Sequence, residues 1–480
     1  FAGIDTMQLR ALNEWVGRCA TLLTGGHQAT DIAVVYPIES LWPRFTPARH
    51  RATDSPSAAE VEQVFDGVSE GLFAARRDFT YIDSRTLAEG AVADGAVVHG
   101  DMRWRVIVLP YVDTLPDAAW RKLAELERTG GVIVAVAARP TNSAREFPSA
   151  RTVQLGERML GTSAEPSVAS YGRGTGIYLP RSAAGLLPMM LDTLLEPDAE
   201  VRDDRSPIRM THRRIDGREV YFLINDSGEQ IDETVSLCVS GSGKRWDPAT
   251  GDVSPVTSGE GLPLHLGPHE GIIYTFGEAR EAKLSHPAGG ALPGMIVESL
   301  PRVEPTEGHG EFVRAEVRPD EVNSTPERAV WRAVGTLTKG AVDTFLFTSF
   351  NYPEGIDLSR AESLVIDTWA PDGQATPSQI LCILHERNGA NYLAPIGRSL
   401  ATPGHVQAYL PLSKLQLAGW SKDANGRLDA DQIIRVSIGW GGYFGTEGET
   451  ITYGLALPRT ARRTRSSAEP PAVRPNAPAR

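Results

Sequence analysis

The sequence has few of the residues that mark several classes of protein. Its three cysteines, Cys19, Cys238 and Cys382, lie far apart in 480 residues. Disulfide frameworks and zinc sites need paired or clustered cysteines, so the sequence predicts neither. The net charge is −12, and basic residues are scattered apart from the C-terminal tail. A nucleic-acid partner is therefore not expected, because such surfaces need clustered Lys and Arg.

Long apolar runs are also missing. No stretch reaches the roughly 18 residues of a membrane-spanning helix, and the start of the chain shows no basic-then-apolar signal. The sequence predicts no membrane partner, no metal and no cofactor. The chain opens at Phe1 rather than Met, so we expect a processed or trimmed chain. Its compartment stays open, with a periplasmic or extracellular location favoured over the cytoplasm.

Strands and amphipathic helices alternate as far as residue 200. Apolar strands are expected at Ile32–Val35, Val106–Leu109 and Val132–Val136, with helices before and between them. This alternation predicts an α/β domain over residues 31–200, with a parallel sheet covered on both faces. The loop after the first strand, residues 36–40, contains no glycine. It is therefore not a phosphate-binding loop, whose backbone must approach the phosphate closely.

The pattern changes to short strands from about residue 208. A small β-sandwich is expected over residues 208–278, with a hairpin turn at Ile215-Asp216-Gly217-Arg218. Pro and Gly then predict a linker over residues 279–309. Residues 310–457 read as an all-β sandwich or jelly roll, and residues 458–480 as a disordered tail.

Several of these segments together resemble a known family. The most specific are HRRIDGREVYFLIND and KRWDPATG, with DIAVVYPIESLWP before them and LPLHLGPHEGIIYTF after. They resemble the C-terminal half of large bacterial glycoside hydrolases of the α-L-rhamnosidase type, glycoside hydrolase family 106 and its relatives. The resemblance covers residues 1–277. It implies a catalytic barrel, then an amidotransferase-like or flavodoxin-like α/β domain, then β-sandwich modules.

The barrel itself is not visible in the sequence. A (β/α)₈ barrel needs eight βα units, whereas four or five precede the β-rich region. Residues 1–30 are expected to be the helix that leaves a missing barrel, and no catalytic carboxylate can be assigned. An active cysteine amidotransferase is not expected either, because no cysteine follows a strand at a sharp turn. The favoured function is an accessory, non-catalytic portion that buttresses the barrel; a stand-alone scaffold or adhesion protein remains the alternative.

Two strands of the predicted parallel sheet end at polar or aromatic residues. Glu39 and Trp42 follow the strand Ile32–Val35, and Asp83 ends a further expected strand, Phe79–Asp83, so all three should lie on one rim of the sheet if the strands are parallel. In the family layout this rim faces the barrel, so the chain is expected to dock there on its own N-terminal catalytic domain. Contact between domains is favoured over contact with substrate, because rim aromatics usually pack.

The last domain resembles the galactose-binding-like jelly rolls that serve as carbohydrate-binding modules. An oligo- or polysaccharide partner is therefore expected, bound by aromatic rings and hydrogen-bonding side chains. The segments GWGGYFG and HERNGANY supply the candidates, which are Trp440, Tyr443, Tyr392, Glu386, Arg387 and Asn391. For Trp440 and Tyr443, core packing and ligand stacking remain equally open. Trp331 and Trp369 are expected in the core.

Overall fold

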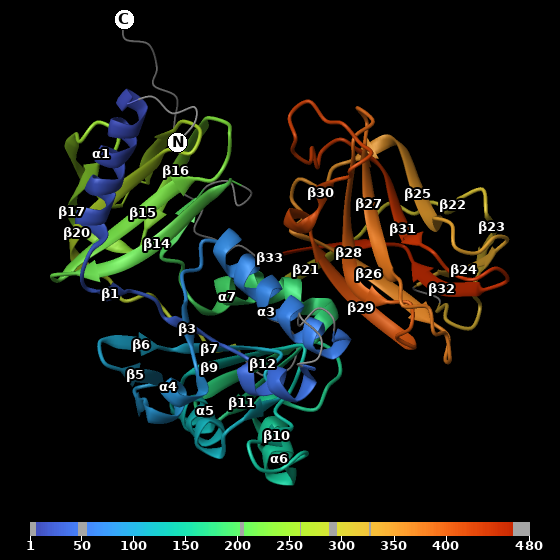
Figure 1. Cartoon of the computed structure of the whole chain (residues 1–480), viewed down its shortest axis with the longest axis horizontal. Helices are drawn as coiled ribbons and strands as arrows, with labels where there is room; N and C mark the ends of the chain where they lie inside the picture. The colour runs from blue at the N-terminus through green and yellow to red at the C-terminus, as the bar shows by residue number, and fades with distance from the viewer. Residues whose placement is uncertain are drawn as a thin grey trace, which may run out of the picture. The chain divides into compact units, whose positions relative to one another are not determined.

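The computed structural model describes residues 6–46, 55–201, 206–259, 261–287, 295–325 and 328–463. The chain forms two compact units, Phe1–Leu292 and Pro293–Arg480 (Figure 1). The first unit contains the α/β domain and a small β-sandwich, and the second contains a larger two-sheet β-sandwich. The protein is therefore multidomain and mostly β.

The α/β domain has a six-stranded open sheet in the order β11-β12-β9-β7-β2-β3. Its strands are β2 (Ile32–Val35), β3 (Thr80–Ile82), β7 (Val106–Pro110), β9 (Val132–Val136), β11 (Ser167–Tyr171) and β12 (Gly174–Leu179). All neighbours are parallel except β11 and β12. Every residue of β2, β7, β9 and β12 is buried, because layers cover both faces of the sheet.

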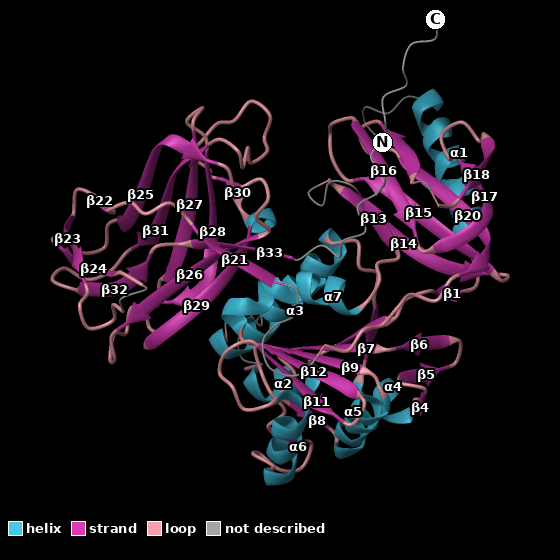
Figure 2. Cartoon of the chain, turned by 180° about the vertical axis from the view of Figure 1, so that it is seen from behind, coloured by secondary structure: helices cyan, strands magenta, loops and turns pink. Residues whose placement is uncertain are grey.

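Helices form those two layers. They are α2 (Ile38–Leu41), α3 (Pro56–Ala74), α4 (Ser84–Glu89), α5 (Asp117–Thr129), α6 (Ala150–Leu160) and α7 (Leu187–Leu194), with 3-10 turns η1 (Trp42–Arg44) and η3 (Arg181–Leu186). Helix α3 buries Val61, Val64, Val68 and Leu72, whose spacing of three to four residues forms one apolar stripe. Figure 2 shows α3 and α7 on one side of the sheet and α5 and α6 on the other.

Two small sheets complete the α/β domain. Strands β4 (Ala91–Ala93), β5 (Ala96–His99) and β6 (Met102–Trp104) form an antiparallel meander. Strands β8 (Thr114–Leu115) and β10 (Asn142–Ser143) pair in parallel.

The small sandwich packs a six-stranded sheet against a three-stranded one. The first has the order β1-β14-β15-β20-β17-β18 and the second β13-β16-β19. Their strands are β1 (His27–Gln28), β13 (Ala199–Val201), β14 (Ile208–Ile215), β15 (Arg218–Asn225), β16 (Ile231–Leu237), β17 (Val239–Trp246), β18 (Val253–Thr257), β19 (Leu262–Leu266) and β20 (Gly271–Ala279). Strands β1 and β13 extend this sandwich beyond the predicted range 208–278.

The first helix, α1 (Thr6–Leu23), covers the outer face of that six-stranded sheet. Cys19 packs with Val220 and Ile273, and Trp15, Leu22, Leu23, Ile215, Phe222 and Trp246 surround them. Arg18 donates hydrogen bonds of 2.9 Å to the carbonyls of Pro248 and Ala249, in the WDPATG turn. The helix expected within residues 1–30 is therefore present, and α1 and β1 are parts of the small sandwich; that this helix leaves a barrel stays a prediction.

The second unit is a sandwich of two antiparallel sheets. One contains β21-β33-β26-β32-β24-β23, with β29 also paired to β26, and the other has the order β22-β25-β31-β27-β28-β30. The strands are β21 (Met295–Ser299), β22 (Thr306–His309), β23 (Val313–Pro319), β24 (Val330–Leu337), β25 (Thr344–Ile356), β26 (Ser363–Ala370), β27 (Gln379–Glu386), β28 (Asn391–Ser399), β29 (Gly404–Pro411), β30 (Gln416–Leu417), β31 (Ile433–Tyr443), β32 (Thr450–Ala456) and β33 (Arg459–Arg463), with the 3-10 turn η4 (Leu412–Lys414).

The ends of this unit differ from the prediction. The expected linker over residues 279–309 contains β21 and β22, which pair with β33 and β25. The expected tail over residues 458–480 contains β33, so the domain does not end at residue 457. The Pro and Gly content of residues 279–309 indicated a region without regular structure, and the short strands β21 and β22 within it were therefore not predicted. Residues 288–294 and 464–480 lie outside the described residues.

Candidate functional site

Trp440 lies in the core of the second unit. Its side chain is 0% exposed, as are those of Val436 and Ile438 on the same strand. These three alternate along β31 and face the opposite sheet. Stacking of Trp440 on a sugar is therefore corrected to core packing. The indole Nε1 has no hydrogen-bond partner among the described residues.

The glycines around Trp440 serve strand packing rather than an exposed rim. A Cβ at Gly439 would lie 2.0 Å from the carbonyl oxygen of Leu346 on β25. Gly439 therefore lets β25 and β31 approach, which any side chain would prevent. Trp331 is also buried, whereas Trp369 is half-buried with its ring stacked on His405.

Glu386 and Tyr392 are buried and hold a loop. Glu386 accepts a hydrogen bond of 2.6 Å from the backbone N–H of Asp429, and burial raises its pKa. The Tyr392 hydroxyl donates to Asp423 at 2.5 Å. Asp423 and Asp429 both belong to the loop between β30 and β31. The prediction that these two residues contact a ligand is thus corrected, because both are buried and hold that loop by hydrogen bonds.

Arg387 and Asn391 lie nearer the surface. Arg387 donates to the carbonyl of Glu354 at 2.8 Å, and Asn391 is half-buried beside Ser421. The sequence candidates omitted His385, which faces outward while Glu386 faces inward. Alternation along β27 would have separated the two, because adjacent strand residues point to opposite faces.

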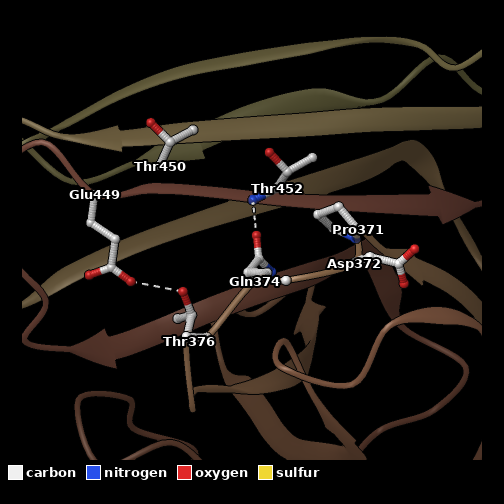
Figure 3. A pocket seen from close by; sticks show the side chains of 9 residues that line it. Pro371, Asp372, Gln374, Thr376, Glu449, Thr450 and Thr452 are labelled. Carbon is white, nitrogen blue, oxygen red and sulfur yellow. Dashed lines mark hydrogen bonds between the residues drawn. The ribbon is translucent and has the colours of Figure 1, made fainter.

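Tyr443 hydrogen-bonds to Glu449, which lines a shallow pocket of about 460 Å³, although Tyr443 itself is not part of the lining. The half-buried Tyr443 hydroxyl donates to the Glu449 carboxylate, with oxygens at 3.0 and 3.1 Å. Figure 3 shows the pocket between the segment after β26 and the start of β32. Its lining comprises Pro371, Asp372, Gly373, Gln374, Ala375, Thr376, Glu449, Thr450 and Thr452.

Hydrogen bonds already order much of this lining. The Thr376 hydroxyl donates to Glu449 at 2.8 Å, and the Thr452 N–H donates to the Gln374 side chain at 2.7 Å. Glu449 and Asp372 lie at opposite ends of the pocket (Figure 3). The hydroxyl, amide and carboxylate groups suit a polyhydroxylated ligand, because sugars both donate and accept hydrogen bonds.

The rim candidates lie where β2 and β3 end. Glu39 hydrogen-bonds through Oε1 to the hydroxyl of Ser84, and its other oxygen is buried without a partner among the described residues. Asp83 is the N-cap of α4 and accepts from the Thr86 N–H at 2.7 Å. This hydrogen bond lowers the pKa of Asp83. Both carboxylates therefore order the rim, and Trp42 beside them is 66% exposed.

A row of aromatic rings continues this rim. Tyr36 and Phe65 have ring centroids 5.1 Å apart, Phe65 and Tyr81 5.2 Å, and Tyr81 and Phe79 5.1 Å. Tyr36 and Tyr81 are 42% and 51% exposed. We call these four side chains together with the exposed Trp42 the aromatic rim, which comprises Tyr36, Trp42, Phe65, Phe79 and Tyr81.

Two buried ionisable groups lie elsewhere in the first unit. His212 contacts Glu219 at 2.6 Å and Asp198 at 3.4 Å. Burial alone would lower the pKa of His212, but these carboxylates outweigh it and raise the pKa to about 9. Glu127 on α5 is fully buried, and neither oxygen has a hydrogen-bond partner among the described residues. Burial raises the pKa of Glu127 to about 9.

Within the described ranges, no group of His, Cys, Asp and Glu has an arrangement that would hold a metal ion. No described helix is long and apolar enough to cross a membrane.

The sequence model of glycoside hydrolase family 106, described as alpha-L-rhamnosidase, matches residues 6–259. The match covers more than half of the chain. No curated protein sequence matches this chain.

Solved structures give more distant likenesses. A rhamnosidase from Novosphingobium sp. PP1Y aligns over 99% of this chain and 40% of its own, with 19% identity and a TM-score of 0.41. A family 42 β-galactosidase from G. stearothermophilus aligns over 57% of this chain and 43% of its own, with 12% identity and a TM-score of 0.38. A family 11 carbohydrate-binding module from Clostridium thermocellum aligns over 35% and 92%, with 13% identity and a TM-score of 0.26. The chain therefore spans less than half the length of both enzymes.

Proposed function

The chain belongs to glycoside hydrolase family 106, and we propose that it is the non-catalytic C-terminal portion of an enzyme of the alpha-L-rhamnosidase type. The match of the family model to residues 6–259 is the observation that carries this proposal. In it, the first unit buttresses a catalytic domain and the second unit binds glycan weakly. The α/β domain is of the amidotransferase-like or flavodoxin-like kind, and the second unit is a galactose-binding-like jelly roll.

The geometry of the α/β domain supports a non-catalytic role. Glycosidases of most families use two carboxyl groups that face each other across the bond to be cleaved. A catalytic barrel would place them on a closed ring of strands, whereas the sheet here is open, with edges at β3 and β11. At the rim, the Glu39 and Asp83 carboxylates are engaged by Ser84 and Thr86.

The aromatic rim supports docking on the catalytic domain of the same polypeptide. Its exposed rings offer the apolar area that a stable interface between domains needs. Trp42 is the largest exposed side chain of this rim and serves as its anchor.

The pocket beside Tyr443 supports glycan binding by the second unit. Gln374, Glu449 and the threonines can exchange hydrogen bonds with sugar hydroxyls. A few such contacts in a shallow site give affinities on the order of 0.1 to 1 mM. Even this affinity helps an attached enzyme, because it raises the local concentration of polymer.

An activity assay tests the non-catalytic role. The purified chain, given an aryl α-L-rhamnoside, is expected to release no aglycone. Turnover that Glu449→Gln or Asp372→Asn abolishes would overturn the proposal, because it would place a catalytic carboxylate within this chain.

Calorimetric titration with short rhamnogalacturonan oligosaccharides tests the binding role. The chain should bind, and Glu449→Gln should weaken binding, whereas Phe444→Ala serves as a neighbouring exposed aromatic control. Absence of binding to every oligosaccharide would refute glycan binding by this portion.

A further inference from the structure

The six-stranded sheet of the second unit has an outward face with an ordered arrangement of side chains. Its register places residues of neighbouring strands directly opposite one another. A polar row consists of Asn391, His385, Arg435 and Asn351, from β28, β27, β31 and β25. A middle row consists of Leu393, Ile383, Ser437, Ser349 and Thr306. An apolar row consists of Pro395, Leu381, Gly439, Phe347 and Gly308.

Hydrogen bonds connect the polar row to the middle row. Arg435 donates to Nδ1 of His385 at 2.9 Å. Because a guanidinium can only donate, Nδ1 must accept and the proton of the neutral imidazole lies on Nε2. That Nε2 donates to the Ser437 hydroxyl at 2.9 Å. The Ser437 hydroxyl lies 2.8 Å from that of Ser349, and either hydroxyl can be the donor, so the hydrogen-bonded groups extend across three strands.

The same direction argues against a catalytic serine. A nucleophilic serine needs a histidine nitrogen that accepts its proton, whereas Nε2 of His385 already carries one. Burial and the charge of Arg435 lower the pKa of His385 to about 4. His385 is therefore neutral at pH 7, and its two hydrogen bonds orient Arg435 and Ser437 rather than prepare Ser437 for proton abstraction.

The apolar row lies on the other side of the serines. Phe347 and Leu381 are half-buried, and Pro395 is exposed. A Cβ at Gly441 would lie 3.4 Å from the Phe347 ring, an ordinary van der Waals distance, so the ring lies beside this position of β31. The neighbouring Phe345 is 39% exposed, with its ring centroid 6.2 Å from that of Phe347.

We propose that this face, with its polar row and its apolar row on either side of the middle row, is a binding surface for a segment of an oligosaccharide chain that runs across the strands. This inference rests on the proposed function, because membership of a glycosidase family makes a glycan the expected occupant. Sugar C–H faces pack on Phe347 and Leu381, and hydroxyls bond to Asn351, Arg435 and Asn391. Four strands span three spacings, roughly 14 Å, which is the length of a short oligosaccharide.

Calorimetric titration of the full chain with short rhamnogalacturonan oligosaccharides and with cellotetraose tests the surface. Phe347→Ala and Arg435→Gln should each weaken binding by about tenfold, since each removes a stacking or charged contact. The matched control is Arg314→Gln, the same change at an exposed position of β23 in the other sheet. It should bind as the unaltered chain does.

Two outcomes separate this inference from the proposed function. If an oligosaccharide binds and only Glu449→Gln weakens it, the pocket is the site and the sheet face is not. If no oligosaccharide binds the unaltered chain, both fail. Thermal unfolding of each variant checks its fold.

Hydrogen exchange of the unaltered chain gives a reading that needs no variant. Bound oligosaccharide should slow exchange in peptides of β27 and β31 more than in residues 371–376. Unchanged exchange in β27 and β31, with slower exchange only in residues 371–376, would refute the sheet-face site.

Discussion

The six-stranded sheet of the small sandwich and the six-stranded sheet of the second unit differ on their outer faces. In the small sandwich, α1 covers that face, and Cys19 of α1 packs against Val220 and Ile273 of the sheet. In the second unit, the corresponding face carries Phe347, His385 and Arg435, which remain half-buried or exposed. The inner faces of both sheets pack against a partner sheet. The same architecture therefore gives a closed layer in one unit and a contact surface in the other, and what lies over the sheet decides which.

A charge introduced on each face should give opposite results. Ile273→Asp places a carboxylate beneath α1, where it has no partner, and should destabilise the first unit by more than about 3 kcal/mol. Leu381→Asp, on the face of the second unit, should cost less than about 1 kcal/mol because water reaches it. Denaturation followed by hydrogen exchange of each unit measures both. Equal losses would show that the second face is covered as well.

The buried acid Glu127 should make the stability of the first unit depend on pH. The folded pKa of Glu127, about 9, lies above its ordinary value of 4.5. Its contribution to stability is therefore complete below pH 4.5 and is lost as pH rises towards 9. For one proton the slope reaches about 1.4 kcal/mol per pH unit.

Glu127→Gln should remove that slope. The gain in stability of this variant over the unaltered chain should therefore be larger at pH 8 than at pH 5. Urea denaturation at both pH values measures the effect, with the exposed Glu157→Gln of α6 as the control. A parent-like slope in Glu127→Gln would contradict the assignment.

The two histidines should act in opposite pH windows. His212 has a raised pKa of about 9, so its contribution to stability is lost as pH rises from 6.5 towards 9. His385 has a lowered pKa of about 4, so its contribution is lost as pH falls from 6.5 towards 4. His212→Gln should reduce the pH dependence of stability between pH 6.5 and 9, and His385→Gln should reduce it between pH 6.5 and 4. The effect of His385 should stay within about 1 kcal/mol, because the side chain is partly exposed. Stability profiles of the two variants that match at both ends of the pH range would argue against these assignments.

The smallest stability effect is expected at the aromatic rim. Trp42→Asp should change the free energy of unfolding by within about 0.5 kcal/mol, because the ring is mostly solvent-exposed. It should nevertheless reduce self-association of the isolated chain, since it breaks an apolar patch. Sedimentation at high concentration measures this. A parent chain that stays monomeric, with no change in the variant, would refute the docking face.

Local patterns in the sequence were sufficient for much of the fold. The turn at Asp216-Gly217 has positive φ at both residues and joins β14 to β15 as predicted, because few residues tolerate that conformation. Strands β2, β7 and β9 of the parallel sheet were visible as buried apolar runs, whereas β11 and β12 were not predicted. Strands β21, β22 and β33 were not, because their side chains are mostly exposed or half-buried and their pairing partners lie far along the chain.

The candidate site residues were harder to predict from the sequence than the fold was. GWGGYFG contains a buried tryptophan and a half-buried tyrosine three residues apart, and composition alone does not distinguish them. His385 and Arg435 were not predicted, because they become neighbours only through the register of β27 and β31. A binding face across strands is a property of long-range pairing, which no single segment encodes.

The pairing of β21 with β33 has a consequence for modularity. Met295 lies opposite Arg463, so the first and last described strands of the second unit are neighbours in one sheet. A domain whose ends are adjacent can be inserted into a surface loop of a host protein without long spacers, or circularly permuted by joining those ends and opening a turn elsewhere. The exposed turn at Gly373, with φ of 77°, is one such opening point.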